Sequence, residues 1–180
     1  MIFEFLRIKL LNKNIFLNRE IRLIKHIKGA PGLRLFGIGP NFLPCKGLYK
    51  LKILLDRNTT WAKNRKIKDL RNCLANSDVI VSLWSNNKIL GFGRALSDGT
   101  YRSVLWDIVI DHNHQGKGYG KLIVNSLLDS ERIKQSEKIY LMTSNQKDFY
   151  CQIGFDEVVS QNLLIKNMKI NIETIHIEQK

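Results

Sequence analysis

The chain has 180 residues, of which 44% are hydrophobic and 25% are charged, a balance typical of a soluble globular protein. Its length fits one domain comfortably and two only with strain. No apolar run approaches the ~18 residues of a membrane span. Charged residues interrupt the opening segment MIFEFLRIKLLNK, so it lacks the apolar core of a secretory signal, and its composition does not resemble a transit peptide.

The formal net charge of +13 favours anionic partners, including nucleic acid and phosphate-bearing cofactors. The basic residues are scattered, and the densest patch, WAKNRKIKDLR, is equally typical of the solvated face of a helix. A nucleic-acid-binding module is therefore an alternative and not the main expectation. Cys45, Cys73 and Cys151 are odd in number and widely spaced, which predicts reduced thiols and no disulfide framework.

In chain order, residues 1–48 are expected to form an N-terminal extension of unclear structure, with one strand or one helix before a Gly- and Pro-rich break. The alternation in YKLKILL (49–55) predicts a strand. A helix is predicted over 58–77, with Thr59 or Thr60 as its N-cap and an apolar face formed by Trp61, Ile67, Leu70 and Leu74.

The hydrophobic period then changes from 3.6 to 2, which predicts an antiparallel meander of strands over 78–85, 88–97 and 101–110 with NN and DGT turns. The remaining pattern predicts a helix over 121–134, a strand over 138–144, a short helix over 145–153 and a strand over 154–170. This order indicates an α/β (α+β) fold with a mixed sheet.

A glycine stretch, QGKGYG, separates the last meander strand from the following helix. Each glycine weakens a helix by roughly 1 kcal/mol relative to Ala. The first helical turn, however, has unpartnered N–H groups and a partial positive charge, and bare α-carbons at Gly116, Gly118 and Gly120 let a phosphate approach them. Lys117 and Lys121 add two cations, so the stretch predicts a pyrophosphate site. A tight strand–helix connection without a ligand is the alternative, and neither a P-loop nor GxGxxG fits the spacing.

Two segments resemble one known family, the GNAT N-acetyltransferases. VLWDIVIDHNHQGKGYGKLIVNSLL is similar to the family's acetyl-CoA-binding motif, [Q/R]-x-x-G-x-[G/A], which is matched by Gln115, Gly118 and Gly120. IYLMTSNQKDFYCQIGF is similar to its second motif, matched by Tyr150, Gly154 and Phe155. The two motifs occur in the family's order and at its separation, and the resemblance covers about residues 49–165.

The resemblance implies a mixed, mostly antiparallel sheet flanked by helices, with acetyl-CoA bound at a splayed central strand pair. It implies an N-acetyltransferase domain over 49–165, followed by a C-terminal strand or tail over 166–180. The expected reaction is direct attack of a primary amine on acetyl-CoA in a ternary complex, without a metal. The acceptor would be a protein lysine, an N-terminus or an arylalkylamine such as serotonin, and the protein a monomer or homodimer. The alternative is a basic nucleic-acid-binding or regulatory module that keeps the acetyltransferase fold without catalysis.

Within the family, the segments are most similar to plastid acetyltransferases encoded in red-algal plastid genomes and to plant chloroplast lysine or serotonin N-acetyltransferases. This similarity implies a plastid-encoded protein of the chloroplast stroma, with a cyanobacterial cytoplasm as the alternative. The cofactor-binding residues that it implies are Ile108, Val109, Ile110, Gln115, Gly116, Lys117, Gly118, Tyr119, Gly120, Lys121 and Ser144. Two positions depart from the family: Thr143 stands where many members carry Asn or Asp, and Val104 where many carry Glu.

Acyl transfer to an amine requires a proton acceptor, because a lysine-like amine with a pKa of ~10.4 is neutral in only about 1 molecule in 2,500 at pH 7, a handicap of roughly 4.6 kcal/mol. Asp107, an acid inside an apolar strand, is the first candidate for the base; Asp111 is the second, and a water chain is a third possibility. A structural pairing of Asp107 with Arg102 is the alternative. The resemblance implies that Tyr150 is the general acid that protonates the departing thiolate.

Two further groups of side chains allow two interpretations each. His112 and His114 flank the loop and are expected to be exposed loop residues and not metal ligands. Trp84, Trp106 and Phe92 either line an acceptor pocket or pack within the sheet.

Overall fold

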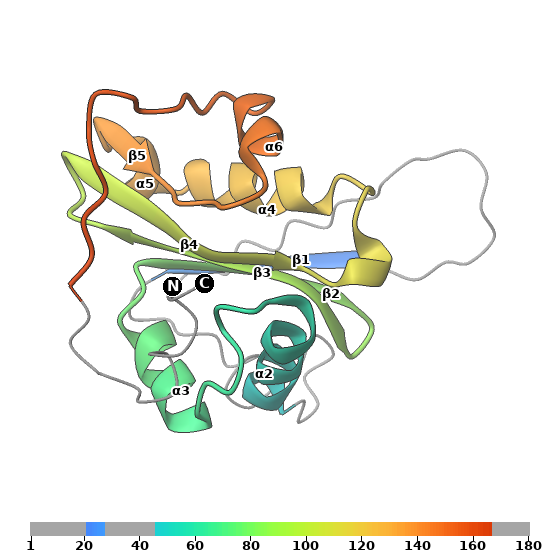
Figure 1. The fold of residues 1–180 in the computed structure, drawn as a ribbon. Coiled ribbons are helices and arrows are strands. Elements are labelled where there is room, and N and C mark those ends of the chain that lie inside the picture. The colour runs from blue at the N-terminus through green and yellow to red at the C-terminus, as the bar shows by residue number, and fades with distance from the viewer. Residues whose placement is uncertain (1–20, 28–45, 167–180) are drawn as a thin grey trace, which may run out of the picture. The chain divides into compact units, whose positions relative to one another are not determined.

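The computed structural model describes residues 21–27 and 46–166 of the chain (Figure 1). The chain divides between residues 142 and 143 into two compact units, which are described separately. Among the described residues, the first unit contains a β-sheet and four α-helices, and the second contains one short α-helix, α6 (Lys147–Cys151). None of the described helices is long and apolar enough to cross a membrane.

The sheet has five strands in the order β1-β2-β3-β4-β5. Their bounds are Ile21–Ile27, Val79–Ser85, Lys88–Ser97, Arg102–Ile110 and Lys138–Tyr140. The first four strands are antiparallel to their neighbours, and β5 is parallel to β4. The mixed, mostly antiparallel sheet and its central meander are therefore confirmed. β1 adds an edge strand from the segment that we expected to be an extension.

The first described helix, α2 (Gly47–Asn58), lies where residues 49–55 predicted a strand, so that prediction is wrong. The leucines at positions 48, 51, 54 and 55 recur at helical spacing, and all four are buried. The short window also alternates, but the buried stripe extends over about two turns and selects the helix.

The helix predicted over 58–77 is shorter than expected, because α3 covers only Ile67–Ala75. Thr59, a predicted N-cap, instead ends α2: its backbone N–H and its Oγ1 donate to the carbonyl of Leu55 at 3.0 and 2.9 Å. Trp61 consequently lies in the connection between the helices, where it is 54% exposed, and not on the buried face of α3.

The helix predicted over 121–134 is two helices, α4 (Tyr119–Leu128) and α5 (Glu131–Lys134). The break falls at Ser130, whose N–H donates to the carbonyl of Leu127 at 3.1 Å and whose own carbonyl accepts the N–H of Ile133 at 2.8 Å. β5 is also shorter than the predicted strand over 138–144.

The short helix α6 lies inside the predicted range 145–153. Residues 155–166 form neither helix nor strand, so the strand predicted over 154–170 is wrong for the residues described. The remainder of that range, the rest of the predicted tail to 180 and residues 1–20 and 28–45 of the predicted extension lie outside the described residues.

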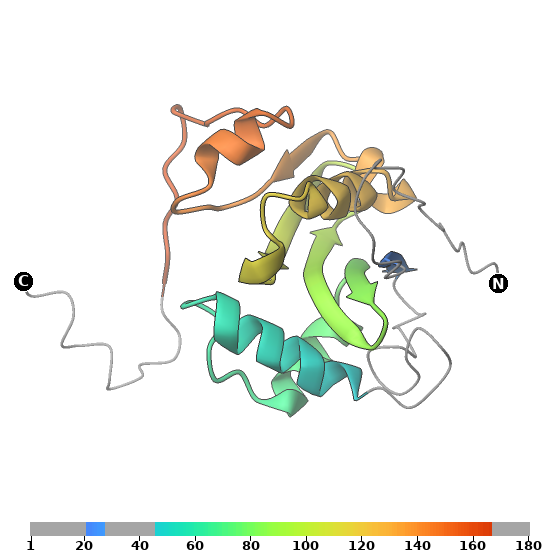
Figure 2. The same ribbon diagram turned by 90° about the vertical axis from the view of Figure 1, so that its right-hand side faces the viewer.

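Helices cover both faces of the sheet. α2 and α3 lie on one face and α4 on the other, as the view along the strands shows (Figure 2). The core on the α2 side includes Leu51, Leu55, Leu74, Trp84 and Phe92. Trp84 and Phe92 therefore pack in the core and do not line a pocket.

On the opposite face, α4 packs closely against β3. A Cβ atom built on Gly91 would lie 2.7 Å from Cδ1 of Ile123, and one on Gly93 would lie 2.8 Å from Cγ2 of the same residue. Both distances are too short for a real contact, so the two glycines allow the helix to approach the strand. The start of α4 is thereby placed at the end of β4.

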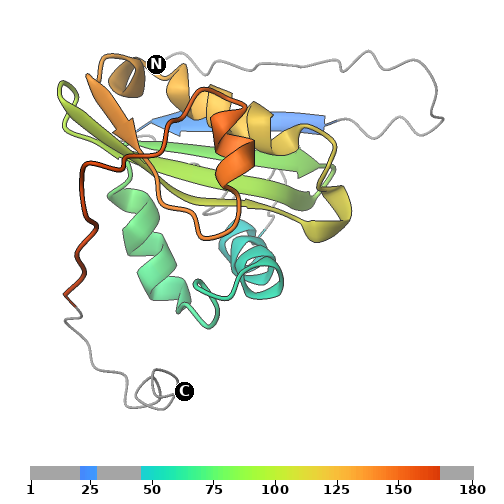
Figure 3. The same ribbon diagram turned by 45° about the horizontal axis from the view of Figure 1, so that its top comes forward.

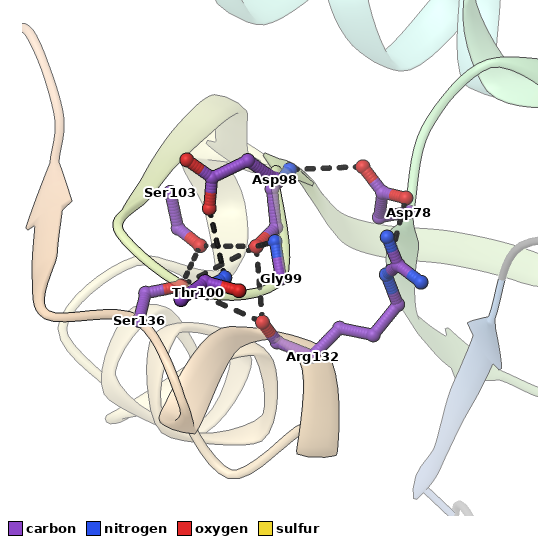
Figure 4. Close-up of polar contacts among 8 residues, drawn as sticks. Asp78, Asp98, Gly99, Thr100, Ser103, Arg132 and Ser136 are labelled. Carbon is purple, nitrogen blue, oxygen red and sulfur yellow. Dashed lines mark hydrogen bonds and ion pairs between the residues drawn. The ribbon is translucent and has the colours of Figure 1, made fainter.

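β4 and β5 are paired for only three residues, Arg102 to Val104 opposite Lys138 to Tyr140 (Figure 3). A polar cluster fixes the paired end (Figure 4): Ser103 Oγ lies 2.5 Å from Ser136 Oγ and 2.8 Å from Ser97 Oγ. Beyond Val104, no described strand pairs with β4 on that side. β4 and β5 therefore meet only next to the β3–β4 turn. Toward its C-terminal end, β4 has an open edge with no described strand beside it.

Candidate active site

The glycine loop connects the C-terminal end of β4 to α4. Gly116 and Gly118 have φ angles of +72° and +78°, a region that side chains strongly disfavour. A Cβ built on either residue would meet no atom within 4 Å, so both α-carbons border open space. Gly118 is the N-cap of α4, which has no side-chain cap and no acidic residue in its first turn.

These features leave the first turn of α4 suited to an anion. The backbone N–H groups at its start have no helical partner, and the peptide dipoles place a partial positive charge there. Lys117 and Lys121 are both exposed and line a groove along the start of the helix, together with Gly118, Tyr119, Leu122 and Asn125. The diphosphate site that the glycine spacing predicted stays a prediction, and the open space at Gly116 and Gly118 is compatible with it. Gly120, the third glycine, lies within α4.

Asp111, which directly follows β4, holds the start of the glycine loop in place through several contacts. Its backbone N–H donates to the carbonyl of Leu90 at 2.8 Å, and its Oδ1 lies 2.9 Å from Nδ1 of His114 and accepts the N–H of Asn113 at 3.1 Å. Lys88 Nζ lies 3.0 Å from the second oxygen, Oδ2. The carboxylate thus joins β3, the end of β4 and the short 3-10 helix His112–His114.

Burial by itself would raise the pKa of Asp111, but hydrogen bonds from His114 and Lys88 outweigh it and lower the pKa to about 2. A carboxylate that releases its proton so readily is a poor general base near neutral pH. Asp111 stays the second candidate base, and its contacts suit a residue that positions the loop.

The two histidines of the loop have different surroundings. His112 is exposed, but its backbone N–H donates to Oδ1 of Asn58, the last residue of α2, at 2.7 Å. His114 is half-buried against Asp111, so the expectation that it is an exposed loop residue is wrong. Among the described residues, no group of three His, Cys, Asp or Glu side chains is placed to hold a metal ion.

The open edge of β4 leads away from the loop. It includes Ile108, Val109 and Ile110, whose backbone groups we expected to pair with the pantetheine arm. An unpaired strand edge offers N–H and C=O groups that an extended chain with amides can join. One carbonyl on this route has a partner, because Gln115 Nε2 donates to the oxygen of Ile110 at 3.3 Å.

A β-bulge interrupts β4 at Asp107. Phe92 pairs with Val109 and Arg94 with Trp106, so Asp107 and Ile108 together stand opposite Gly93 alone. Asp107 has a φ angle of +54°, which is unusual for a residue with a side chain. A bulge bends its strand and re-aims the side chain at that point.

Two arginines hold the carboxylate of Asp107. Arg94 Nε lies 2.6 Å and Arg65 Nη1 lies 3.1 Å from the same oxygen, Oδ2, and the Asp107 side chain is only 4% exposed. The partner expected from the sequence, Arg102, instead contacts Glu137 at 2.9 Å. Arg94 also lies over the ring of Trp106, with its Cζ atom 5.9 Å from the ring centroid. Arg65 and Arg94 were not singled out from the sequence.

The second unit contains the other predicted catalytic residue. Tyr150 lies on α6 and is half-buried, with edge-to-face ring contacts to Phe149 and Phe155 at centroid distances of 4.9 and 5.9 Å. Burial raises the pKa of Tyr150, which keeps its hydroxyl protonated at neutral pH. Thr143 Oγ1 accepts the N–H of Gln146 at 3.1 Å, next to the start of α6, and Ser144 is exposed.

The structure therefore brings together the glycine loop, its Asp111 anchor, the open edge of β4 and the Asp107 bulge, all within the first unit. Tyr150, Thr143 and Ser144 belong to the second unit and are placed only within it. An open strand edge that ends at a helix start suited to an anion is the arrangement that the resemblance to the GNAT family led us to expect.

Comparison with known proteins identifies the family. Residues 76–157 match the family model described as the acetyltransferase (GNAT) domain. The chain is 30% identical over 141 residues to the uncharacterized N-acetyltransferase ycf52 of Gracilaria tenuistipitata var. liui, covering 76% of this chain and 75% of that protein. The chain belongs to the GNAT family of N-acetyltransferases, as the two motifs indicated.

Further relatives agree with this assignment. The chain is 35% identical over 113 residues to the uncharacterized N-acetyltransferase ycf52 of Pyropia yezoensis, covering 60% of this chain and 64% of that protein. It is 34% identical over 70 residues to the protein named GCN5-related N-acetyltransferase 2, chloroplastic, of Arabidopsis thaliana, covering 38% of this chain and 27% of the relative. The match to the Pyropia protein thus spans less than two thirds of its length.

Among solved structures, the fold is similar to that of a GNAT-family acetyltransferase from Xanthomonas campestris pv. campestris, with a TM-score of 0.62. The two chains are 18% identical, and the superposition covers 81% of this chain and 93% of the other. At this identity the likeness supports the fold alone.

Proposed function

We propose that the protein is an acetyl-CoA-dependent N-acetyltransferase that transfers the acetyl group to a primary amine by direct attack. The observation that carries this proposal is the start of α4, where two positive-φ glycines border open space and two exposed lysines stand beside them in the sequence. Because acetyl-CoA carries a diphosphate and two amides, the glycine loop and the open edge of β4 fit two different parts of it. When bound, it supplies an activated acetyl thioester.

The residues of the first unit bind and orient this molecule. The N–H groups from Gln115 to Lys121 hold the diphosphate, and the β4 backbone from Ile108 to Ile110 pairs with the arm. Four residues of an extended strand span about 13 Å. A pantetheine arm that runs back along β4 for this distance from Ile110 therefore ends beside Trp106 and Asp107. The bulge is thus where we place the reacting carbon.

Proton transfer requires a base near that point. Asp107 is our proposed base, and the free oxygen Oδ1 is the atom that would accept the proton, because both arginines contact Oδ2. A water bridged to Oδ1 serves equally, since the carboxylate is nearly buried. We propose that Tyr150, whose hydroxyl stays protonated at neutral pH, donates to the departing thiolate.

The setting and the acceptor are also proposals. The similarity to a chloroplastic relative supports a plastid stroma, with a cyanobacterial cytoplasm as the alternative. A protein lysine or N-terminus and a small arylalkylamine remain the two acceptor classes, and a monomer or a homodimer fits both. The family resemblance supports a reaction without a metal cofactor.

Thermal unfolding with and without acetyl-CoA tests the cofactor site. At a hundredfold excess over Kd, binding adds about 2.7 kcal/mol, which for a chain of this size raises Tm by about 5 °C or more. Gly118→Glu fills the cradle with a negative charge and abolishes the shift. Gly99→Glu is the matched control, because Gly99 has a φ of +83° in the β3–β4 turn. It lowers Tm by similar strain but keeps the shift. A wild-type protein with no shift in millimolar acetyl-CoA refutes the proposal.

A further inference from the structure

A basic surface adjoins the bulge of β4. Residues 56–77, which span the end of α2, the connection and α3, carry six basic side chains and two acidic ones. We call five of the basic residues the basic face: Lys63, Arg65, Lys66, Lys68 and Arg71. Four of the five are exposed and Arg65 is half-buried. One of the two acids, Asp56, is paired with Lys52 at 2.6 Å.

Carboxylates offset the charge of the basic face only in part: Lys63 is near enough to Asp56 to help lower the pKa of that acid, and Asp69 lies in the first turn of α3. Within the described part of the chain, Lys63, Lys66, Lys68 and Arg71 make no ion pair with a carboxylate, and Arg65 makes one with Asp107. That carboxylate is already shared with Arg94. The face and the bulge beside it therefore present an excess of positive charge to a molecule that approaches.

Arg65 joins the basic face to the bulge. Its Nη1 contacts Asp107, and its Cζ lies 5.5 Å from the ring centroid of Trp61, which is 54% exposed. The Arg65 side chain is itself 32% exposed. A guanidinium held by an aromatic ring and a carboxylate is fixed in orientation, and its remaining donors suit a planar carboxylate.

The proposed path of acetyl-CoA places the reacting carbon beside the basic face. The arm ends near Trp106 and Asp107, and α4 covers the opposite face of the sheet (Figure 2). An amine that reaches the bulge comes close to Arg65, whose Nη1 contacts Asp107 there. Its ammonium form is repelled there unless the acceptor also carries negative charge.

We propose that the acceptor is a lysine within an acidic peptide segment, whose carboxylates pair with Arg65 and the neighbouring lysines while the lysine reaches the bulge. This inference rests on the proposed function and names its substrate class. The adjacent carboxylates steer the acceptor to the site and offset the repulsion of its amine. Polyamines and basic tails are disfavoured for the same reason.

Three peptides test the proposal, each N-terminally blocked with a single lysine flanked by Glu, by Gln or by Arg. The full chain is assayed with acetyl-CoA by the release of free thiol. At low ionic strength kcat/KM for the Glu peptide is expected to be about tenfold higher than for the Gln peptide, and the Arg peptide is expected to be poorest. Half-molar salt removes most of the preference, because it screens exposed charges.

Charge-removing variants locate the effect. Lys63→Gln combined with Lys66→Gln is expected to reduce the Glu-over-Gln preference about threefold, since each exposed pair contributes little. The matched control combines Lys134→Gln with Lys138→Gln, two exposed lysines on α5 and β5, and keeps the full preference. If both pairs of substitutions reduce the preference equally, the basic face is not the recognition surface.

The outcomes separate this inference from the proposed function. Equal rates for the Glu and Gln peptides, or a preference for the Arg peptide, overturn the acidic acceptor but leave acetyl transfer intact. Acetylation of none of the peptides by a protein that acetyl-CoA stabilises also overturns it. A further outcome also overturns it: the three peptides react equally, and a short RNA binds tightly in a salt-sensitive way that the double substitution Lys63→Gln and Lys66→Gln abolishes. Absence of any acetyl-CoA-dependent Tm shift refutes the proposed function itself.

Discussion

Nε of Arg94 lies 2.6 Å from Oδ2 of Asp107, and the two side chains are only 12% and 4% exposed. The pair links β3 to β4 at the bulge, where Asp107 adopts a positive φ. Arg65, in the connection between α2 and α3, contacts the same oxygen. The interaction therefore fixes the one irregular point of β4 and leaves Oδ1 as the oxygen without a hydrogen-bond donor among the described residues.

The substitution Asp107→Asn tests whether that oxygen accepts a proton. Asn tolerates a positive φ, so the backbone is expected to keep its course while the charge is lost. If Asp107 is the base, kcat/KM falls by about 100-fold at pH 7 and recovers toward pH 10, where the acceptor amine is itself neutral. The pH dependence of kcat/KM for the wild type and the variant measures this.

Loss of the buried carboxylate leaves two arginines unpaired and lowers stability as well. Circular dichroism and the acetyl-CoA-induced Tm shift show whether the variant is folded and still binds. Arg65→Gln serves as the control, because it removes one cation and keeps the carboxylate. A pH profile of Asp107→Asn that parallels that of the wild type would leave Asp107 with a structural role only.

Tyr150→Phe removes a hydroxyl whose pKa burial raises above its usual value of 10. Without the acid, the departing thiolate is unprotonated, and kcat is expected to fall by about 100-fold. The Kd for acetyl-CoA should change little, because the aromatic contacts with Phe149 and Phe155 remain. Titration calorimetry and initial rates separate the two quantities. An unchanged kcat between pH 6 and 10 removes Tyr150 from the mechanism.

The glycine loop and the meander were predictable from the sequence for a physical reason. Each depends on a local pattern, either alternation of apolar residues or a backbone that only glycine allows at Gly116 and Gly118. The strand predicted at 49–55 is wrong because that seven-residue window leaves out Leu48. The helical spacing of the four buried leucines of α2 is complete only when Leu48 is included. A local sequence pattern therefore predicts a helix or strand reliably only when the window covers the whole element.

The cluster around Asp107 was only partly accessible from the sequence. Counting back from the DGT turn pairs Ser97 with Ser103 and places Arg94 opposite Trp106, next to Asp107. The bulge was not predictable, because nothing local marks the extra residue. Arg65 reaches the carboxylate across 42 residues of chain from a connection without regular structure, and such a contact follows from tertiary packing alone.

Gly93→Val tests how the packing of α4 positions the loop. Its Cβ would lie 2.8 Å from Cγ2 of Ile123 and 3.2 Å from Cδ1 of Leu127, so the helix must shift or the side chains must repack. Overpacking of this kind costs about 1–3 kcal/mol. We expect a lower Tm and a weaker affinity for acetyl-CoA, and Gly93→Ala should give smaller changes in both. If Gly93→Val leaves the affinity for acetyl-CoA unchanged, contacts within the loop itself, and not the packing of α4, determine the position of the loop.

The strongest of those contacts are made by Asp111, and its titration gives the last prediction. Its pKa is about 2 in the folded protein and 3.8 as the ordinary value, so the folded state favours the ionised form. The stabilisation, about 2 kcal/mol, is therefore present above pH 4 and is lost as the pH falls from about 4 to 2. Asp111→Asn should lower the free energy of unfolding by about that amount at pH 7.

Urea unfolding at pH 7, 5, 4 and 3 measures this difference between the wild type and Asp111→Asn. The difference should be constant down to pH 5 and then shrink, because the carboxyl of the unfolded chain takes up a proton near pH 3.8 while that of the folded protein, held by His114 and Lys88, takes one up only near pH 2. Asp129→Asn, at an exposed position, is the control and should stay within about 0.5 kcal/mol of the wild type. If the difference in the free energy of unfolding does not vary with pH, the packing and hydrogen bonds of the Asp111 side chain, and not its negative charge, stabilise the loop.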